Sequence, residues 1–428
     1  MSSPFAFPFI SFVAFFLCLH VAWPLTVLWE QCPDFVLSLS SNLDCSVSGG
    51  SERASEIDVP SLVKKSESFD TISDFFPWTH PPICTDIVSS LNAPLCIFTN
   101  ASFSSGRGIS IITTEDIALE FASLEPFVLD HTPTNVNTSP SRQPWKATPI
   151  ANKGMGLVAT ESIPAGSLIA AYQPVVLVHP EISSFKNTAE GLIRLAVDQL
   201  PPSTSANFLN LSTQYNNPHI ICSDILKSNS FELAVGPTMH LSLIPEPSRL
   251  NHDCGPNAQY YLDHSQLTHY VHASREIAEG EEITVSYVDP FATHAGRQEH
   301  LSSFGFTCTC RRCTNDAASD RTLGQIHELQ GLLGNWKTRD ATPEKALELI
   351  KLSESEGLDA FMDVAYGHAA LAYNAVRDKK RAKEYATLAR EKSGQRYGPH
   401  GRDLGMWDEL MNDPTKHWSW MWRKRNVH

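Results

Sequence analysis

Residues 248–257 read Ser-Arg-Leu-Asn-His-Asp-Cys-Gly-Pro-Asn. Polar side chains, one thiol and a Gly-Pro turn crowd around a single large apolar residue, so this stretch is poor core material. Farther along the chain, Cys308, Cys310 and Cys313 form a C-x-C-x-x-C cluster, which is one ligand short of a closed tetrahedral zinc site. Cys254 is the candidate for the missing ligand, and we expect the four cysteines to bind one zinc ion.

A disulfide is the competing fate of these thiols. Cys308 and Cys310 are separated by one residue, a spacing that makes disulfide geometry difficult without backbone strain. Thiolates that share one metal ion accept such a tight loop. The spacing therefore favours metal over oxidation.

Two further stretches complete the pattern. Residues 281–287 read Glu-Glu-Ile-Thr-Val-Ser-Tyr, a β-type run that ends in a phenol, and residues 153–157 read Lys-Gly-Met-Gly-Leu. With the R-x-N-H-x-C-x-P-N run at 249–257 and an F-x-C-x-C-x-x-C cluster that opens at Phe306, they resemble a SET domain over residues 145–314. The spacing of the cysteine cluster is most similar to the SMYD and fungal SET5-like branch.

The resemblance implies a protein-lysine N-methyltransferase that uses S-adenosylmethionine and a structural zinc. It gives the Tyr287 phenol the role of orienting the substrate amine and the methyl group, together with backbone carbonyls. It also implies a set of cofactor contacts, with Phe306 on the adenine and the main chain of His252 against the amino-acid end: Lys153, Gly154, Met155, Gly156, Asn229, Asn251, His252, Tyr287 and Phe306. The alternative is that Tyr287 is an ordinary strand aromatic and that Asn251 and His252 only satisfy backbone groups.

The chain departs from the family pattern at two points. Phe304 stands where SMYD enzymes carry a second channel tyrosine, so the number of methyl groups added is in doubt. SMYD proteins also embed a cysteine-rich MYND module between the two SET halves. The only thiol between Lys153 and Leu250 is Cys222, and we therefore predict that this module is absent.

Composition restricts the partners. The 428 residues are 42% hydrophobic and 19% charged, as in a globular chain that buries a large core. A net charge of −14 argues against a general nucleic-acid surface, but it suits a basic, lysine-rich protein substrate. The resemblance alone would make that substrate a histone.

The N-terminus predicts entry into the secretory pathway. Residues 4–22 are nearly continuous apolar sequence, nearer in length to the apolar part of a signal peptide than to a membrane span. We expect residues 1–24 to be a signal peptide or an anchor, which would be the only membrane contact. No Lys or Arg precedes the run and His20 stands near the expected cleavage point, so a nuclear or cytoplasmic protein with a non-functional leader is the alternative.

Residues 25–131 are expected to form a cysteine-containing module. Its four thiols, Cys32, Cys45, Cys84 and Cys96, allow three pairings, or could remain unpaired as small apolar residues. Glycosylation sequons occur at Asn100, Asn137 and Asn210. A strand is predicted over 109–112 and a helix over 114–124, capped by Thr114.

The remaining organisation is a linker over 132–149, a SET domain with a helical insert over 150–306, a zinc-binding post-SET loop over 307–320 and a helical C-terminal domain over 321–428. Helical periodicity predicts four C-terminal helices, over 323–336, 343–355, 361–376 and 379–395. The fold class is α+β: small twisted sheets with the pseudoknot-type threading of the SET family, followed by helices.

Two non-enzymatic interpretations remain open. One is a catalytically idle SET scaffold that binds a partner through the C-terminal helices. The other is a secreted, disulfide-stapled binding module with a vestigial SET core. Binding of S-adenosylmethionine and transfer of a labelled methyl group separate them from an enzyme.

Overall fold

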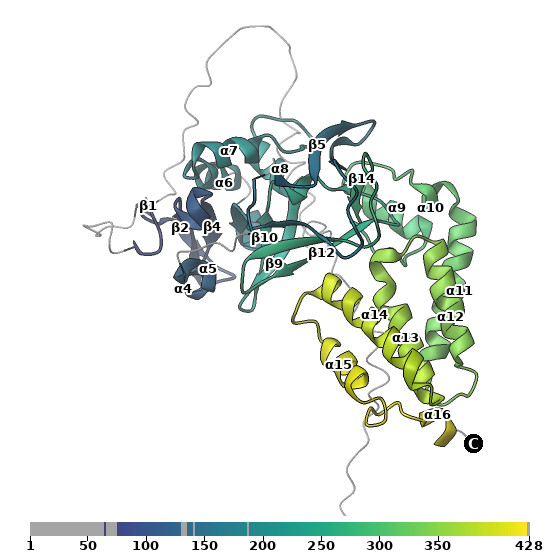
Figure 1. Ribbon diagram of the computed structural model, residues 1–428. Coiled ribbons are helices and arrows are strands. Elements are labelled where there is room, and N and C mark those ends of the chain that lie inside the picture. The colour runs from purple at the N-terminus through teal and green to yellow at the C-terminus, as the bar shows by residue number, and fades with distance from the viewer. Residues whose placement is uncertain (1–63, 66–74, 130–134, 140–141, 186–187, 426–428) are drawn as a thin grey trace, which may run out of the picture.

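The computed structural model describes residues 64–65, 75–129, 135–139, 142–185 and 188–425, and its strands and its long helices occupy two different regions (Figure 1). The strands form a seven-stranded sheet of order β1-β2-β3-β4-β8-β10-β9, a four-stranded sheet of order β11-β14-β6-β5 and a three-stranded sheet of order β12-β13-β7. The strands are β1 Lys64–Lys65, β2 Ile83–Val88, β3 Ala93–Asn100, β4 Ile109–Thr113, β5 Trp145–Ile150, β6 Gly154–Ala159, β7 Leu168–Tyr172, β8 Val176–Val178, β9 Ser230–Val235, β10 Thr238–Leu243, β11 Asn251–His252, β12 Ala258–Asp263, β13 Thr268–Ala273 and β14 Glu282–Val285.

Several of the earlier helices pack against the sheets, and from residue 311 onward the helices form a region of their own beneath them (Figure 1). The α-helices are α3 Phe103–Gly106, α4 Glu115–Ser123, α5 Glu125–Val128, α6 Ala189–Asp198, α7 Pro202–Leu209, α8 Ile221–Asn229, α9 His294–Ser302, α10 Arg311–Thr314, α11 Asp316–Gly334, α12 Pro343–Ser355, α13 Met362–Ala375, α14 Lys379–Tyr397, α15 Leu404–Asn412 and α16 Trp422–Arg425. Short 3-10 turns are η4 Pro180–Ser184, η5 Pro247–Arg249 and η6 Asp359–Phe361. The α+β fold class is confirmed, with a β-rich part followed by helices.

The seven-stranded sheet joins the N-terminal segment to the SET region. Strand β4 pairs antiparallel with β3 and parallel with β8, with Ile111 opposite Leu177. All five residues of β4 are buried, because α6 packs on one side of it and α4 on the other. A strand that is apolar on both faces needs cover on both faces. Residues 83–113 therefore share a sheet with the SET region, and the expected separate module over 25–131 is not what the described residues form.

The expected linker over 132–149 contains a strand. Residues Trp145–Ile150 form β5, which pairs with β6 along its whole length. Trp145 is 4% exposed and donates its indole N–H to the carbonyl of Ile169, whereas Lys146 and Ala147 face solvent. The linker prediction was wrong here because an edge strand with one buried residue carries little apolar periodicity.

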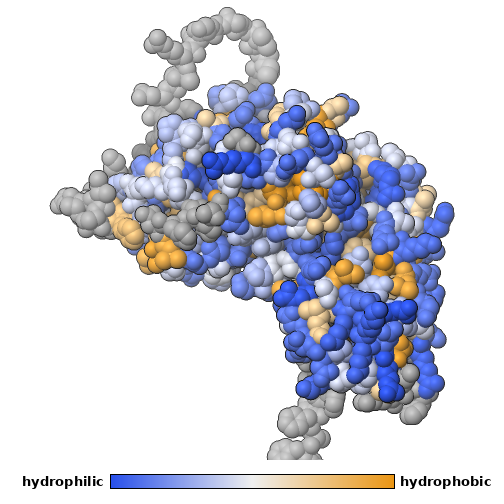
Figure 2. Space-filling view, viewed as in Figure 1, coloured by the Kyte–Doolittle hydropathy of each residue, from blue (hydrophilic) through white to orange (hydrophobic). Residues whose placement is uncertain are grey.

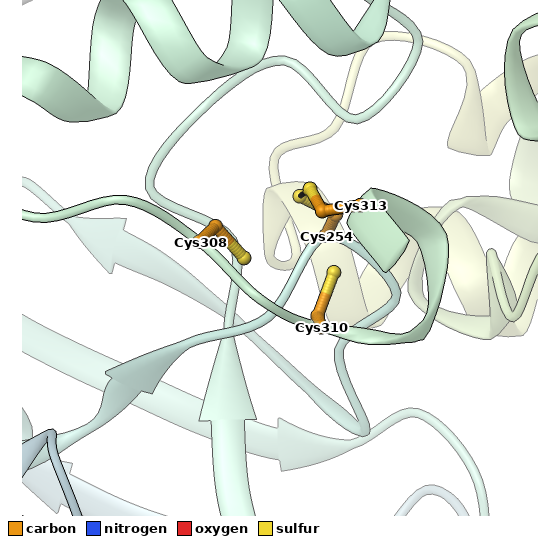
Figure 3. A group of neighbouring side chains, drawn as sticks. All are labelled: Cys254, Cys308, Cys310 and Cys313. Carbon is orange, nitrogen blue, oxygen red and sulfur yellow. Dashed lines mark hydrogen bonds between the residues drawn. The ribbon is translucent and has the colours of Figure 1, made fainter. Parts of the chain in front are cut away.

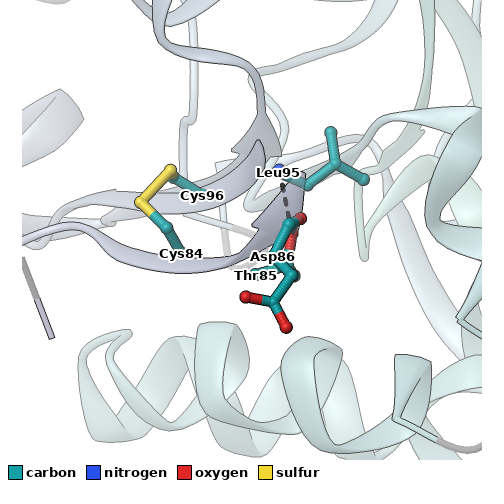
Figure 4. The surroundings of a disulfide bond; sticks show 5 residues. All are labelled: Cys84, Thr85, Asp86, Leu95 and Cys96. Carbon is teal, nitrogen blue, oxygen red and sulfur yellow. Dashed lines mark hydrogen bonds between the residues drawn. A yellow bond between two sulfur atoms is a disulfide. The ribbon is translucent and has the colours of Figure 1, made fainter. Parts of the chain in front are cut away.

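One of the N-terminal cysteine pairings is present. Cys84 and Cys96 face each other on β2 and β3 and form a disulfide (Figure 4). The sequence left the pairing open because it depends on the strand register. Cys32 and Cys45, like the predicted leader, lie outside the described residues. The predicted helix after β4 is confirmed as α4, but its N-cap Thr114 makes no side-chain capping hydrogen bond.

Two of the three sequons differ in accessibility. The Asn137 amide nitrogen donates to Ser104 Oγ at 2.6 Å and to Gln173 Oε1 at 2.9 Å, and its Oδ1 accepts the Gln173 backbone N–H. A glycan on this nitrogen would remove these contacts. Asn210, in contrast, is exposed at the end of α7.

The C-terminal region contains the four predicted helices as α11 to α14, and α12 has the predicted bounds. Small buried residues let α13 and α14 pack closely, among them Ala370, Ala382 and Ala386. The predicted post-SET loop over 307–320 was wrong in part, since α10 and the start of α11 lie within it. The visible face of this region is mostly hydrophilic, as amphipathic helices require (Figure 2). Within the described residues, no helix has both the length and the apolar character needed to span a membrane.

Candidate active site

Two of the stretches that carry the SET resemblance, residues 249–257 and residues 281–287, meet as neighbouring strands. Strand β11 lies parallel to β14, with Asn251 opposite Thr284 and His252 opposite Val285. Just beyond β14, the Tyr287 backbone N–H donates to His252 Nδ1 at 3.0 Å. This contact fixes which ring nitrogen of His252 accepts, and it ties the turn that carries Tyr287 to β11.

The Tyr287 phenol lies in an aromatic pocket. Its hydroxyl donates to the carbonyl of Leu250 at 2.5 Å. The ring centroids of Phe304 and His252 each lie 5.4 Å from that of Tyr287, and Phe306 lies 6.4 Å away. Burial raises the pKa of the Tyr287 phenol above its usual range, and nearby Tyr260 and Glu282 raise it further. The phenol therefore remains protonated at neutral pH and donates its proton in the hydrogen bond to the Leu250 carbonyl.

On the other side of β14, Glu282 connects three of the predicted cofactor residues. Its Oε1 accepts from Asn251 Nδ2 at 2.8 Å, and its Oε2 pairs with Lys153 Nζ at 2.7 Å. A Cβ added to Gly156 would lie 2.7 Å from Asn251 Nδ2 and 3.0 Å from Glu282 Oε1. Gly156, which the resemblance implies as a cofactor contact, is therefore also required for β6 to approach these side chains.

Gly154 plays a different part from Gly156. Its φ of +74° lies in the left-handed region that favours glycine, and a Cβ there would meet no described atom within 4 Å. Met155 between them is half-buried. The structure thus brings the 153–156 stretch and Asn251 together around one carboxylate, and it leaves open space at Gly154.

Asn229 and Phe306 lie at the margins of this group. The Asn229 side-chain nitrogen donates to the carbonyls of Ser212 and Ile225, at 2.8 and 2.7 Å, while its own carbonyl accepts from Ser248 Oγ. These contacts attach the end of α8 to the segment that precedes β11. Phe306 is 37% exposed, with its ring centroid 6.1 Å from that of His252, so part of the side chain is accessible to solvent.

The four cysteines gather behind His252. Their sulfur atoms all lie within 4.8 Å of one another, and Cys254 Sγ is 3.6 Å from Cys313 Sγ. Four thiolates at tetrahedral positions about 2.3 Å from one zinc ion would be roughly 3.8 Å apart, so both the donor set and the spacing are compatible with zinc. The side chains converge from the segment after β11 and from the segment that leads into α10 (Figure 3). Cys254 Sγ is 3.2 Å from His252 Nε2, which links the cluster to the Tyr287 pocket.

Helix α9 holds the cysteine segment from a third direction. Gln298 forms a pair of hydrogen bonds with the backbone of Cys308, at 2.8 and 3.0 Å. Its neighbour Arg297 is fully buried. From α10, Arg312 donates to the Cys254 carbonyl at 2.6 Å and to Glu356 Oε2 at 2.9 Å.

Sequence reasoning missed these polar residues. Glu282 lies inside the predicted strand motif, two residues before the buried Thr284. Side chains two residues apart on a strand share a face, and this spacing was the available signal. Arg297 and Gln298 gave no signal, because α9 was not predicted. Arg312 lies inside the C-x-x-C spacing, where the cysteines alone drew attention.

Comparison with known sequences agrees with this geometry. Residues 154–288 match the family described as SET domain, and the chain therefore contains a SET domain. It is 31% identical over 195 residues to histone-lysine N-methyltransferase set5 of Schizosaccharomyces pombe, covering 44% of this chain and 55% of that protein. It is also 31% identical over 130 residues to histone-lysine N-methyltransferase SMYD3 of Mus musculus, covering 28% and 29% of the two chains. The predicted resemblance to the SMYD and SET5-like branch is confirmed.

The chain thus spans about half of the set5 protein and less of SMYD3. Among solved structures, the methyltransferase domain of human SETMAR aligns with 34% of this chain and 44% of its own, at 16% identity and a TM-score of 0.21. That overlap is too slight to add to the assignment. Both of these relatives are named as histone-lysine N-methyltransferases.

Proposed function

We propose that this protein is an S-adenosylmethionine-dependent protein-lysine N-methyltransferase with a structural zinc site. The observation that carries the proposal is the position of Tyr287, whose hydroxyl donates to Leu250 and whose ring is enclosed by aromatic neighbours next to β11. Relatives named as histone-lysine N-methyltransferases support the same reaction class.

The pocket suits a lysine amine that must lose its charge. A free lysine has a pKa of about 10.4 and is almost entirely protonated at neutral pH. An aromatic, largely dry pocket disfavours the charged form and lowers the pKa of the amine. The carbonyl of Leu250 and the phenol oxygen of Tyr287 can then orient the neutral nitrogen.

The cofactor residues are proposed on the same grounds. S-adenosylmethionine, when bound, supplies a methyl group carried on a positively charged sulfur. Gly154, with open space at its missing side chain, lets the backbone approach it, and the Asn251 side chain and His252 main chain would contact its amino-acid end. The exposed part of the Phe306 side chain offers a stacking surface for the adenine.

The proposed zinc links this pocket to the rest of the molecule. Cys254 follows β11 directly, whereas Cys308, Cys310 and Cys313 follow α9. One ion bound by all four would hold Phe304 and Phe306 against the Tyr287 ring, because these residues lie only a few positions before Cys308. Metal removal should therefore open the pocket before the whole chain unfolds.

The substrate is proposed to be a lysine-containing protein. The relatives' names refer to histones, and a net charge of −14 suits a basic partner, but the lysine itself is not defined by the pocket. Phe304 contributes a ring without a hydroxyl, so the number of methyl groups is proposed to differ from that of enzymes with tyrosine at this position.

Secretory entry is a separate proposal. The Cys84–Cys96 disulfide supports it, because such bonds persist in oxidising compartments. Locating the full-length protein in cell fractions, with and without a glycosidase, tests it, and a purely nuclear or cytosolic protein with reduced Cys84 contradicts it.

Methyl transfer from tritiated S-adenosylmethionine to a protein extract tests the enzymatic proposal. Tyr287→Phe removes only the hydroxyl, so we expect it to bind the cofactor as the wild type does and to transfer methyl groups on the order of 100-fold more slowly. Tyr385→Phe, in α14 of the helical region, is the matched control and should keep full activity. Unchanged turnover in Tyr287→Phe refutes the assigned role, and wild-type protein that binds no S-adenosylmethionine refutes the proposed function.

A further inference from the structure

Arg297 is a charged side chain in an unusual place. It lies on the inner face of α9, one turn before Leu301, and both side chains are fully buried. Leu301 packs in the same cluster as Cys254, Cys308 and Cys313. An isolated buried charge is costly, so a buried guanidinium requires a compensating anion.

Neutral hydrogen-bond acceptors among the described residues compensate little of the charge of Arg297. Nη1 of Arg297 donates to the carbonyl of Ala292 at 2.5 Å, but Nε and Nη2 have no hydrogen-bond partner among the residues that the structure describes. The face of α9 that carries Arg297 and Leu301 is turned toward the cluster of Cys254, Cys308 and Cys313. Burial lowers the pKa of Arg297, but the nearby Cys254 and Cys313 raise it.

A second guanidinium increases the demand for negative charge. Arg312 is 2% exposed, and its own Nη2 lacks a partner among the described residues. Arg312 Nη1 donates to the Cys254 carbonyl, so a second buried cation lies beside the same cysteine cluster. Glu356 is the one carboxylate paired with them, through Arg312 Nε.

With four neutral thiols, two buried cations would share one buried carboxylate. Four thiolates around one Zn²⁺ carry a net charge of about −2, which compensates both guanidinium groups. The planar fork of arginine can also donate to two sulfurs at once, and it cannot lose its proton under ordinary conditions.

We propose that Arg297 is a positioning residue of the zinc site, where it donates N–H groups to the thiolates of Cys254 and Cys313 and provides charge that makes the metal-bound form the stable one. This inference rests on the proposed zinc site. The proposal predicts that the buried charge of Arg297 stabilises the metal-bound protein and destabilises the metal-free protein. A residue that only fills space would affect both forms in the same direction.

The test measures zinc content and zinc affinity of the full-length protein, by elemental analysis and by competition with a coloured chelator. Outer-shell substitutions at metal sites weaken binding by about 10- to 100-fold, and we expect this loss in Arg297→Met. Arg297→Lys keeps the charge but not the fork and should lose several-fold less. Arg390→Met, which removes an exposed guanidinium paired with Asp408 on the helical region, is the control and should bind zinc as the wild type does.

The second measurement is thermal unfolding with zinc and after chelation. The zinc-bound Arg297→Met protein should unfold at a lower temperature than the zinc-bound wild type, and the metal-free variant at a higher temperature than the metal-free wild type. Wild type with one zinc and Arg297→Met with the same affinity overturns this inference alone. Wild type without zinc overturns both the inference and the zinc site. If Arg297→Met does not fold, an affinity of Arg297→Lys equal to that of the wild type overturns the inference.

Discussion

His269 packs against the rings of Phe231 and Tyr260, with centroid distances of 4.5 and 4.6 Å. Its side chain is fully buried, and neither ring nitrogen has a hydrogen-bond partner within the described part of the chain. Burial lowers the pKa of His269 from 6.5 to about 3. The imidazole is therefore neutral in the folded protein and takes up a proton only on unfolding.

The sign of the pH effect follows from this shift. The folded pKa lies below the unfolded value, so proton uptake by His269 does not destabilise the fold above about pH 6.5 and destabilises it increasingly as the pH falls toward 3. We predict that His269→Phe raises the free energy of unfolding by about 1 kcal/mol at pH 7, because a polar group without a partner leaves the core. At pH 5 the advantage should be about 2 kcal/mol larger.

Urea unfolding of both proteins at pH 7 and pH 5 measures the difference. His219→Phe is the control, because His219 is exposed and its variant should show no pH-dependent gain. An advantage of His269→Phe that stays constant between the two pH values would mean that the imidazole is solvated or paired in solution.

The residues that could be predicted from the sequence are those that belong to a recognisable sequence motif. Tyr287, Asn251, His252 and the four cysteines stand in a fixed order along the chain, and the fold brings them together. Arg297 and His269 could not be predicted in the same way. Their importance comes from partners that lie in other elements, or from the lack of partners, and neither is visible along the chain.

At the scale of elements, continuous patterns were predicted well and edge positions poorly. Helix α12 has the predicted bounds, since Pro343 opens it and Gly357 follows it closely, and the sequence prediction of a strand at 109–112 is matched by β4. Strand β5 was missed because only one of its residues, Trp145, is buried. The sheet that joins β4 to β8 is a long-range pairing, and local sequence does not encode it.

Strand β6 gives a testable contrast between its two glycines. A Cβ at Gly156 would lie 2.6 Å from Ile150 Cγ1 and 2.7 Å from Asn251 Nδ2. We predict that Gly156→Ala lowers the free energy of unfolding by about 2 kcal/mol, the range of overpacking in a close contact. Gly154→Ala meets no atom and should cost about 1 kcal/mol, from its left-handed backbone alone.

Urea unfolding gives both free energies, and titration with S-adenosylmethionine gives a second readout. Gly156→Ala should also weaken cofactor binding, because it displaces Asn251 from Glu282. If Gly156→Ala is as stable as the wild type, β6 and Asn251 can separate without cost, and the close approach is not required.

At the scale of the whole molecule, the helical region and the cysteine cluster meet at the end of α12. A Cβ on Gly255 would lie 3.0 Å from the carbonyl of Gly357 and 3.1 Å from that of Glu356, so the two backbones are almost in contact. Arg311 donates to the carbonyl of Ser355 at 2.9 Å. The helical region is therefore attached to the segment that carries Cys254.

Arg312 and Glu356 form the buried centre of this junction. Their side chains are 2% and 10% exposed, and Ser319 Oγ donates to the same carboxylate at 2.5 Å. Glu356→Met would leave the Arg312 guanidinium buried without its carboxylate, and we predict a loss of about 3 to 5 kcal/mol in the free energy of unfolding. The double variant Arg312→Met/Glu356→Met should lose less free energy of unfolding than the sum of the two single losses, by on the order of 2 kcal/mol.

Urea unfolding of the zinc-saturated wild type, both single variants and the double variant completes this cycle. Lys345→Met/Glu348→Met, an exposed pair on α12, is the control and should show almost no coupling. Because Arg312 also donates to the Cys254 carbonyl, its loss should release the cysteine segment as well as the helical region. The single variants should therefore lose zinc to a chelator faster than the wild type. Additive losses in the cycle, together with unchanged zinc release, would mean that the helical region and the cysteine cluster are stable independently of each other.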